Sequence, residues 1–232
     1  MNNSLVSVIM SAHNAEKTIE KAINSLLDQT YANLEILLVD DFSSDRTLGI
    51  CEDFDKSYEN ITLFRNDKNI GLTRSLNKLI NKSKGVYIAR QDADDVSAEG
   101  RIEKQLTFLR KHNLDACSSR AYILESNKIT PSKSFYLPKK LVMRIKNPFI
   151  HGTLLIKKKV IQEIGLYNED FYYSQDYKLM SDLLNENFKI KIYKEPLYYL
   201  NMKGNISINQ KEDQKYYADC VRKKIKPIKV NK

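Results

Sequence analysis

The feature that most constrains the fold is a repeated alternation of short apolar runs with amphipathic stretches in the first hundred residues. Residues 5–10, 34–41, 60–66 and 86–90 are apolar runs rich in β-branched side chains, as in buried parallel strands. Between these runs, apolar residues recur every three or four positions, which is typical of one helix face. Strands that alternate with helices through short connections predict an α/β fold with a mostly parallel sheet and helices on both faces.

Local signals mark the predicted helix ends. Asn14 is expected to cap a first helix with a stripe of apolar residues, namely Ile19, Ala22, Ile23, Leu26 and Leu27. Gly85 is expected to end a helix that starts near residue 69. The second half is less regular: we expect a helix near 99–112, a strand at 151–156 and a helix at 174–184.

Length and composition exclude several classes of protein. A chain of 232 residues that is 42% hydrophobic can bury a substantial core. No apolar run approaches the ~18 residues of a membrane-spanning helix, and the N-terminus lacks the basic region of a secretory signal. Cys51, Cys117 and Cys220 are widely spaced, which predicts neither a disulfide framework nor a cysteine zinc site. We therefore expect a reducing, cytoplasmic setting.

The net charge of +9 is concentrated in two stretches. Residues 139–160 contain seven basic side chains and no acidic one, and residues 201–232 contain nine basic and three acidic ones. Such surfaces attract phosphates, nucleic acids or anionic lipids, or are simply solvated. Nucleic acid is not expected as a partner, because the chain has no Trp and no clear interleaving of basic and aromatic residues.

Polar residues follow three of the predicted strands. Residues 11–14 follow the first, Asp40 and Asp41 end the second, and a group of three aspartates, Asp92, Asp94 and Asp95, follows the fourth. In parallel sheets, ligands bind at the carboxyl ends of the strands. This convergence predicts a binding site at that edge of the sheet.

The pair Asp92 and Asp94 can point its carboxylates at one divalent ion. Hard oxygen ligands suit Mg²⁺ or Mn²⁺, which take further ligands from water and substrate phosphates. The alternative is a solvated acidic turn that complements a helix N-terminus.

Asp40 and Asp41 are candidates for a contact with a bound nucleotide. An acid at a strand end can accept hydrogen bonds from a base or a ribose hydroxyl. A phospho-accepting receiver domain also carries paired acids, but there the pair follows the first strand.

Glycine-rich phosphate loops are absent. A bound diphosphate would therefore need a metal and cations such as Arg74, which is otherwise an ordinary exposed helix arginine.

Two residues of the second half are candidates for the reaction itself. Asp176, just after the potential helix cap Ser174, either takes a proton from an incoming hydroxyl or complements the helix dipole. His151 is a metal ligand, a substrate contact or a structural histidine. The residues alone leave these alternatives open.

Five segments taken together resemble the family 2 glycosyltransferases of the GT-A fold that build bacterial surface polysaccharides. The resemblance covers roughly residues 5–200 and its motifs occur in the family's order. They are VSVIMSAHNAEKTIEKAINSLLDQTY, EILLVDDFSSDRT, NIGLTRSLNKLI, VYIARQDADDVSAEGRIEKQLTFL and IHGTLLIKKKVIQEIGLYNEDFYYSQDYKLMSDLL.

The resemblance implies a role for each matching position. A nucleotide-sugar pocket would be formed by Ala12, His13, Asn14, Asp40, Arg74 and Asp92. Asp94 would bind Mn²⁺ or Mg²⁺, and Asp176 would be the general base. The family usually has Glu before this base, where this chain has Gln175. Gln175 and His151 are expected on the acceptor side or close to the metal.

The function implied is inverting, metal-dependent transfer of a hexose or N-acetylhexosamine from a UDP-sugar to a hydroxyl of a glycan or lipid-linked acceptor. We expect a nucleotide-binding half at 1–98, an acceptor-side half at 99–200 and a basic extension at 201–232. The basic stretches suggest peripheral contact with the anionic inner membrane. Two alternatives remain: a sugar-phosphate nucleotidyltransferase, which usually needs the missing glycine-rich loop, and a non-catalytic nucleotide-binding module.

Overall fold

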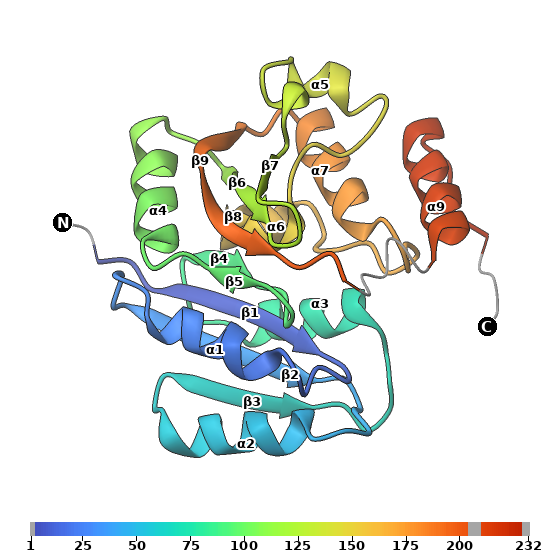
Figure 1. Ribbon diagram of the computed structural model, residues 1–232. Helices are drawn as coiled ribbons and strands as arrows, with labels where there is room; N and C mark the ends of the chain where they lie inside the picture. Colours follow the sequence, from blue (N-terminus) through green and yellow to red (C-terminus); the bar gives the residue numbers. More distant parts are fainter. Residues whose placement is uncertain (1–2, 204–209, 229–232) are drawn as a thin grey trace.

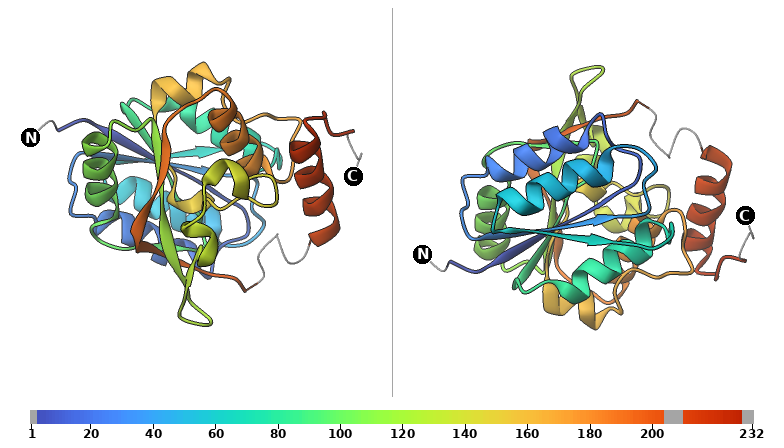
Figure 2. Two further views of the ribbon diagram at one scale, coloured as in Figure 1. Left: turned by 90° about the horizontal axis from the view of Figure 1, so that it is seen from above. Right: turned by 90° about the horizontal axis from the view of Figure 1, so that it is seen from below.

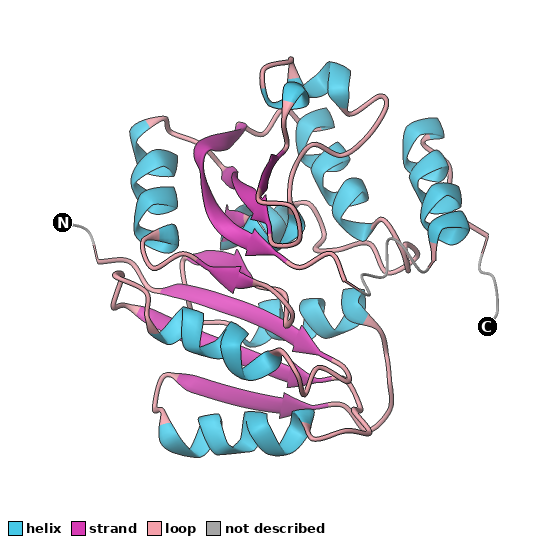
Figure 3. Cartoon of the chain, viewed as in Figure 1, coloured by secondary structure: helices cyan, strands magenta, loops and turns pink. Residues whose placement is uncertain are grey.

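The N-terminal half of the chain is a parallel sheet whose strands alternate with helices, as predicted (Figures 1 and 3). The computed structural model describes residues 3–203 and 210–228. In chain order this half contains β1 (Val6–Ala12), α1 (Ile19–Leu27), β2 (Leu34–Asp40), α2 (Thr47–Ser57), β3 (Ile61–Arg65), α3 (Leu72–Lys82) and β4 (Tyr87–Arg90).

The second half adds strands of both orientations to the same sheet, together with further helices. Its elements are β5 (Val96–Ser97), α4 (Arg101–Lys111), β6 (Ala116–Ile123), β7 (Lys128–Thr130), η1 (Lys133–Phe135), α5 (Lys139–Val142), η2 (His151–Thr153), β8 (Leu155–Lys157), α6 (Lys158–Glu163), α7 (Gln175–Asn185), β9 (Ile190–Leu200) and α9 (Lys211–Lys223). The strand order is β3-β2-β1-β4-β8-β6-β9-β5, with β7 beside β6. β4 is therefore an interior strand, parallel to β1 on one side and antiparallel to β8 on the other.

Side chains alternate between the two faces of the sheet, and each face has its own core. Ile9 of β1 packs with α3, α6, α7 and α9. Its neighbours Val8 and Met10 pack on the other face with α1, α2 and α4. A strand buried on both faces must be apolar at successive positions, which explains the uninterrupted apolar runs in the sequence.

The register brings the predicted strand-end residues to one edge. Ala12 at the end of β1 pairs with Asp40 at the end of β2. Ile9 pairs with Arg90, so that the residues after β4 begin beside the last residues of β1. The arrows of β1, β2 and β3 end on the same side of the molecule in Figure 1.

Three local expectations are wrong. The residue before α1 is Thr18, and Asn14 instead lies in a left-handed turn (φ 51°), where it bonds to a neighbouring loop. α3 ends at Lys82 and Ser83 is extended, so Gly85 is not its cap. A Cβ at Gly85 would lie 2.5 Å from the Ser7 hydroxyl, which shows that close strand packing requires this glycine. Within 151–156, the first residues form the 3₁₀ helix η2 and only Leu155 begins a strand.

α9 packs on the same core as α7. Tyr217, Cys220 and Val221 are buried in the core that contains Phe171 and Met180. Residues 204–209 and 229–232 of the predicted basic extension lie outside the described residues. In the part of the chain that the structure describes, no helix has the length and apolar character needed to cross a bilayer.

Candidate active site

The loops that follow β1 and β2 are held together by hydrogen bonds at the edge of the sheet, and their residues 12–14 and 40–44 form a surface that we call the wall. The His13 ring nitrogen Nδ1 donates to the carbonyl oxygen of Asp41 at 3.0 Å. The Asn14 side chain accepts the Ser44 amide at 2.9 Å, and the Asn14 amide donates to the Ser43 hydroxyl at 3.0 Å. These bonds explain why Asn14 adopts a left-handed turn and does not cap α1. The predicted nucleotide residues therefore lie on a braced surface.

Asp41 is a structural carboxylate. Its two oxygens accept the amides of Ile70 and Gly71 and the Asn66 side chain, each at 2.9 Å. Gly71 has a φ of +85°, a conformation that glycine adopts without strain. Asp41 thus ties the β2 loop to the start of α3, with all of its contacts inside the protein.

Asp40 has unused hydrogen-bonding capacity. Its side chain is fully buried, and Oδ2 accepts the Ser43 amide at 3.2 Å. Oδ1 has no hydrogen-bond partner among the described residues. A buried acceptor without a partner is costly, so a donor from a ligand would stabilise it. Because the carboxylate is fully buried, a ligand could reach Oδ1 only if the surrounding residues move.

Arg74 lies in the first turn of α3 and is half exposed. Its guanidinium pairs with Glu169 at 3.2 Å, which joins α3 to the segment before α7. The structure therefore places this predicted nucleotide residue in an ion pair, beside the loop that Asp41 orders rather than among the aspartates that follow β4.

Asp92 is held rigidly at the end of β4. Arg90, which is 1% exposed, donates to its Oδ1 at 2.5 Å. The Asp92 amide donates to the hydroxyl of the buried Tyr198 at 3.0 Å. Gly152 lies against both groups, and a Cβ there would come within 2.7 Å of Asp92 Oδ2 and collide with the Tyr198 hydroxyl. Only glycine lets η2 approach the end of β4 this closely.

Asp94 and Asp95 crowd the same turn with negative charge. Burial, followed by the negative charge of Asp92, raises the pKa of Asp94 to about 6. Burial and the charges of Asp92 and Asp94 raise the pKa of Asp95, whose Oδ1 accepts the Asn201 amide at 2.7 Å. Arg90 is the cation that pairs with this group among the described residues. A further cation would therefore be stabilised here.

This turn fits a divalent ion that is bound together with a substrate. Carboxylate oxygens are the ligands that Mg²⁺ and Mn²⁺ prefer. Within the described chain, however, no three His, Cys, Asp or Glu side chains are grouped so as to hold a metal by themselves. Asp92 and Asp94 can supply part of a coordination shell, and the phosphate oxygens of a nucleotide would have to supply more of it.

Asp176 lies in the first turn of α7 and is partly buried. The Asn147 side chain donates to its Oδ2 at 2.8 Å. The preceding Ser174 has left-handed backbone (φ 54°) and bonds to Gln214 of α9, so its side chain does not cap α7. Gln175 is buried at the first helical position. Asp176 is therefore fixed by a partner from another segment.

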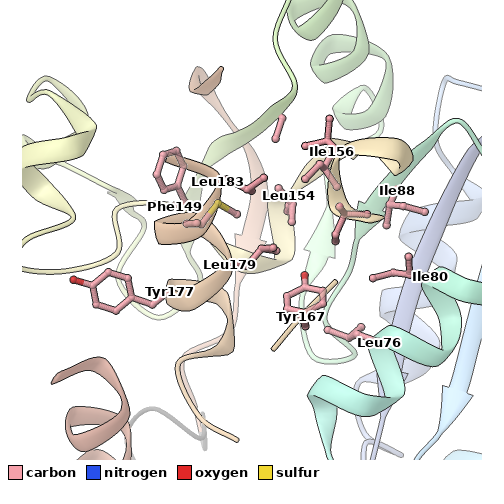
Figure 4. Close-up of a cluster of buried hydrophobic side chains, with 14 of the residues drawn as sticks. Leu76, Ile80, Ile88, Phe149, Leu154, Ile156, Tyr167, Tyr177, Leu179 and Leu183 are labelled. Atoms are coloured by element: carbon pink, nitrogen blue, oxygen red, sulfur yellow. The ribbon is translucent and has the colours of Figure 1, made fainter. Parts of the chain in front are cut away.

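His151 and Tyr167 connect the acidic turn to α7. Their side chains share a hydrogen bond of 2.8 Å. Burial and the nearby positive charge of Arg90 lower the pKa of His151 to about 4, although the negative charges of Asp176 and Asp92 act in the opposite direction. The same three groups act on Tyr167, which Figure 4 shows among core side chains of α3 and α7. The negative charges of Asp92 and Asp176 therefore both act on the His151–Tyr167 pair.

The sequence-predicted residues thus form two groups. One is the wall of Ala12, His13, Asn14 and Asp40 after β1 and β2. The other contains Asp92, Asp94, His151 and Asp176, contributed by β4, η2 and α7.

Sequence reasoning missed the residues that support the second group. Arg101 is fully buried and donates to the carbonyls of Arg90 and Gly152 at 3.0 and 3.1 Å. Tyr198, Tyr167 and Asn147 come from distant segments. Only Arg90 carried a signal, because a charged residue at the end of an apolar run must find a partner when buried.

Two hollows outside these groups are not lined by any predicted site residue. One, of about 320 Å³, lies between α7 and α9. The other, of about 430 Å³, lies at the start of β4 beside Val86 and Lys157–Lys159.

Comparison with known proteins places the chain in a family. The family described as Glycosyl transferase family 2 matches residues 7–181. A protein of Haemophilus influenzae named an uncharacterized glycosyltransferase is 33% identical, over 88% of this chain and 67% of its own length. An Escherichia coli protein, the UDP-Glc:alpha-D-GlcNAc-diphosphoundecaprenol beta-1,3-glucosyltransferase WfgD, is 31% identical over 81% of this chain and 72% of its own.

A solved structure supports the fold. The mannosyltransferase PcManGT from Pyrobaculum calidifontis, in complex with GDP-Man and Mn²⁺, superposes with a TM-score of 0.77. It is 17% identical, and the match covers 98% of this chain and 66% of that one. This likeness confirms the predicted GT-A architecture. With the family match over residues 7–181, it establishes that the chain belongs to glycosyl transferase family 2.

Proposed function

We propose that this glycosyltransferase moves a hexose or N-acetylhexosamine from a UDP-sugar to a hydroxyl of a glycan or lipid-linked acceptor, with inversion and with a divalent metal. The observation that carries the proposal is the shared environment of the two acidic centres. Residues 147–152 contact both centres: Asn147 donates to Asp176 Oδ2 at 2.8 Å, and a Cβ at Gly152 would lie 2.7 Å from Asp92 Oδ2. A donor held at the first centre would thus have a proton acceptor nearby.

The nucleotide would lie along the wall formed by Ala12, His13 and Asn14. Asp40 Oδ1 would accept a hydrogen bond from the base, and Arg74 would lie close to it. Uridine is favoured because the E. coli relative is named for a UDP-glucose donor. Asp92 would contact the ribose or the diphosphate.

Asp94, with Asp92, would hold Mn²⁺ or Mg²⁺ against the diphosphate. The bound ion would neutralise the charge on the departing diphosphate. Burial and crowding of the carboxylates support this assignment, since both favour a cation at the turn. The presence of Mn²⁺ in the mannosyltransferase complex agrees with it.

Asp176 would act as the general base. Asn147 occupies its Oδ2, which orients Oδ1 to accept the proton of the acceptor hydroxyl. That oxygen would attack the anomeric carbon on the face opposite the diphosphate, and a single displacement inverts the configuration. Holding the two substrates in line contributes through orientation, and the base adds ~10²–10⁴-fold.

The acceptor side would be built from residues of the second half. His151 lies at the start of η2, where it bonds to Tyr167, and Gln175 directly precedes Asp176 at the start of α7. The acceptor of the E. coli relative is a saccharide on diphosphoundecaprenol, as its name states. A lipid-linked saccharide at the inner membrane face is the corresponding acceptor proposed here.

A donor screen tests the proposal. UDP-glucose, UDP-N-acetylglucosamine, UDP-galactose and GDP-mannose are each incubated with the protein, with Mn²⁺, Mg²⁺ or a chelator, and nucleoside diphosphate release is measured. We expect release from a UDP-sugar that depends on the metal. Nucleotide binding without any turnover would favour the binding module. Consumption of a nucleoside triphosphate with a sugar phosphate would favour the nucleotidyltransferase.

A further inference from the structure

Residues 133–146, the basic apolar segment, expose large apolar side chains around α5. Tyr136 and Ile145 are 77% and 75% exposed, and Leu137 and Leu141 are each 54% exposed. Isolated exposed apolar residues are ordinary, but four within ten positions are not. Figure 2, in its view from above, shows α5 on the near face with α9 to its right.

The exposed side chains are displayed on a fixed support. The same segment buries Val142 and Met143. The Lys139 ammonium donates to the carbonyls of Ser134, at 3.2 Å, and of Phe135 and Leu137, which closes the turn before α5. The segment therefore has anchors of its own and holds its outer apolar side chains in water.

Contacts with α7 and α9 fix the end of the segment. The Tyr177 hydroxyl donates to the Met143 carbonyl, and Arg222 of α9 donates to the Ile145 carbonyl at 3.1 Å. The Ile145 backbone is therefore fixed by Arg222, while its side chain stays exposed to solvent. Such a display is unfavourable unless another surface covers it.

The charge of the segment identifies the kind of surface that would cover it. Lys133, Lys140, Arg144 and Lys146 are exposed, and no acidic residue occurs between Glu125 and Glu163. Apolar side chains surrounded by cations match the interface of an anionic bilayer, where the apolar groups enter among the headgroups. A second copy of this chain would bring like charges together, which opposes self-association.

The segment also leads directly into the candidate active site. Asn147, the residue after it, donates to Asp176. A bilayer bound at the segment would lie close to the start of α7. An acceptor on a lipid carrier would then reach the proposed base without leaving the membrane; this functional consequence rests on the proposed function, whereas membrane binding itself does not.

We propose that the basic apolar segment is the surface through which this glycosyltransferase docks on anionic membranes. Tyr136, Leu141 and Ile145 enter the headgroup region, and Lys140, Arg144 and Lys146 bind anionic lipid. The two contributions act together, so that removal of either weakens binding.

Vesicle co-sedimentation of the full chain tests this. Vesicles of phosphatidylglycerol and phosphatidylcholine in equal parts are compared with phosphatidylcholine alone, at low and physiological salt. We expect binding only to the anionic vesicles. Tyr136→Ser with Ile145→Ser should lower the partition coefficient about ten-fold or more. Arg144→Glu with Lys146→Glu should lower it by a similar factor and reduce its salt dependence.

A control variant is provided by the hollow at the start of β4, which is also lined by apolar and basic side chains. Val86 is 57% exposed and Lys159 is exposed, so Val86→Ser with Lys159→Glu removes one apolar and one basic group elsewhere. We expect this variant to bind vesicles nearly as well as the wild type. An equal loss in the control would mean that total charge drives binding, and would overturn the proposal. So would absence of wild-type binding to anionic vesicles at low salt.

Two further measurements separate the other outcomes. Sedimentation velocity without vesicles reports self-association. A dimer that Tyr136→Ser with Ile145→Ser converts to a monomer, with vesicle binding unchanged, would make the segment a dimer interface and overturn the proposal. UDP affinity and thermal melting are measured for every variant. Lost vesicle binding with normal UDP affinity and melting is the expected pattern, whereas vesicle binding without any use of a nucleotide sugar would count against the proposed function alone.

Discussion

Asn147 donates a 2.8 Å hydrogen bond to Asp176, and so joins the loop before η2 to the first turn of α7. Asn147 is also held in place through its own Oδ1, which accepts the Phe149 amide at 3.0 Å. The carboxylate proposed as the base therefore has a fixed orientation before any substrate binds. Preorganisation of this kind is what a proton acceptor needs if it is to act in the transition state.

Replacement of Asp176 by Asn should nearly abolish transfer and leave donor binding intact. The amide cannot accept the proton of the acceptor hydroxyl, so kcat should fall by ~10²–10⁴-fold. UDP affinity, measured by calorimetry, should stay close to that of the wild type. Asp182→Asn is the matched control, because Asp182 lies on the same helix in an ion pair with Lys178. Turnover by Asp176→Asn at the wild-type rate would refute the assignment of the base.

Asp94→Ala should remove the metal dependence of UDP binding. With one of the two carboxylates at the turn gone, added Mn²⁺ should no longer increase the affinity for UDP. Titration calorimetry with and without Mn²⁺ measures this directly. The exposed Asp67, replaced by Ala, serves as the control and should keep the metal effect. An unchanged metal effect in Asp94→Ala would show that the ion is held elsewhere.

Gly152→Ala should disrupt the end of β4. The added methyl group would lie 2.7 Å from Asp92 Oδ2 and collide with the Tyr198 hydroxyl, so it must displace one of them. We expect a loss of about 1–3 kcal/mol in the free energy of unfolding and weaker UDP binding. Gly49→Ala in α2 is the opposite case, since nothing lies within 4 Å of the new Cβ. That change should stabilise the protein by about 0.5–1 kcal/mol. Denaturant unfolding compares the two, and a neutral Gly152→Ala would show that the approach of η2 to β4 is not tight.

The pH dependence of stability should include a contribution from His151. The ring bonds to Tyr167, and burial with the positive charge of Arg90 lowers its pKa to about 4, against the opposing charges of Asp176 and Asp92. In the unfolded chain the ring takes a proton below a pH of about 6.5. The free energy of unfolding therefore decreases as the pH falls from about 6.5 to about 4, by about 1–3 kcal/mol, and this loss is complete below that window.

The variant His151→Gln isolates this contribution, because carboxylates titrate in the same range with their own effects. The difference in melting temperature between wild type and variant is measured at a series of pH values. We expect the advantage of the wild type to shrink between pH 6.5 and 4. A constant difference would mean that His151 does not change its charge on unfolding in this range.

The parallel half of the fold follows from the sequence because its signals are local. Residues 36–39 of β2 are buried on both faces, and a strand in that position must be apolar at successive positions. The same locality explains why the sequence singles out Asp40, Asp92 and Asp94 as candidates: Asp40 ends β2, and the other two lie within four residues of the end of β4. Asp176 is a candidate from the sequence because it lies in the first turn of a helix with a clear apolar periodicity.

The remaining parts depend on contacts between distant segments. Asn14 has the composition of a helix cap, but a hydrogen bond to Ser44 in another loop decides its conformation. Residues 151–153 have the composition of a strand, yet Arg101 binds the Gly152 carbonyl and Thr153 bonds back to Ile150, which favours a 3₁₀ turn. Arg101 itself gives no sign in the sequence that it will be buried. The contacts of Asn14 with Ser44 and of Arg101 with Gly152 join residues that are 30 or more positions apart, so a local sequence pattern cannot predict them.

The contact between β4 and β8 has a consequence for how such enzymes can diversify. From β3 to β4 the sheet is parallel and holds the residues proposed to bind the nucleotide, whereas β8 begins the part of the chain that leads to Asp176, the proposed base. The two regions are joined through an interior strand that is paired on both sides. If the proposed roles of the two regions hold, insertions or exchanges in the later loops would alter the choice of acceptor and leave the donor side of the sheet intact.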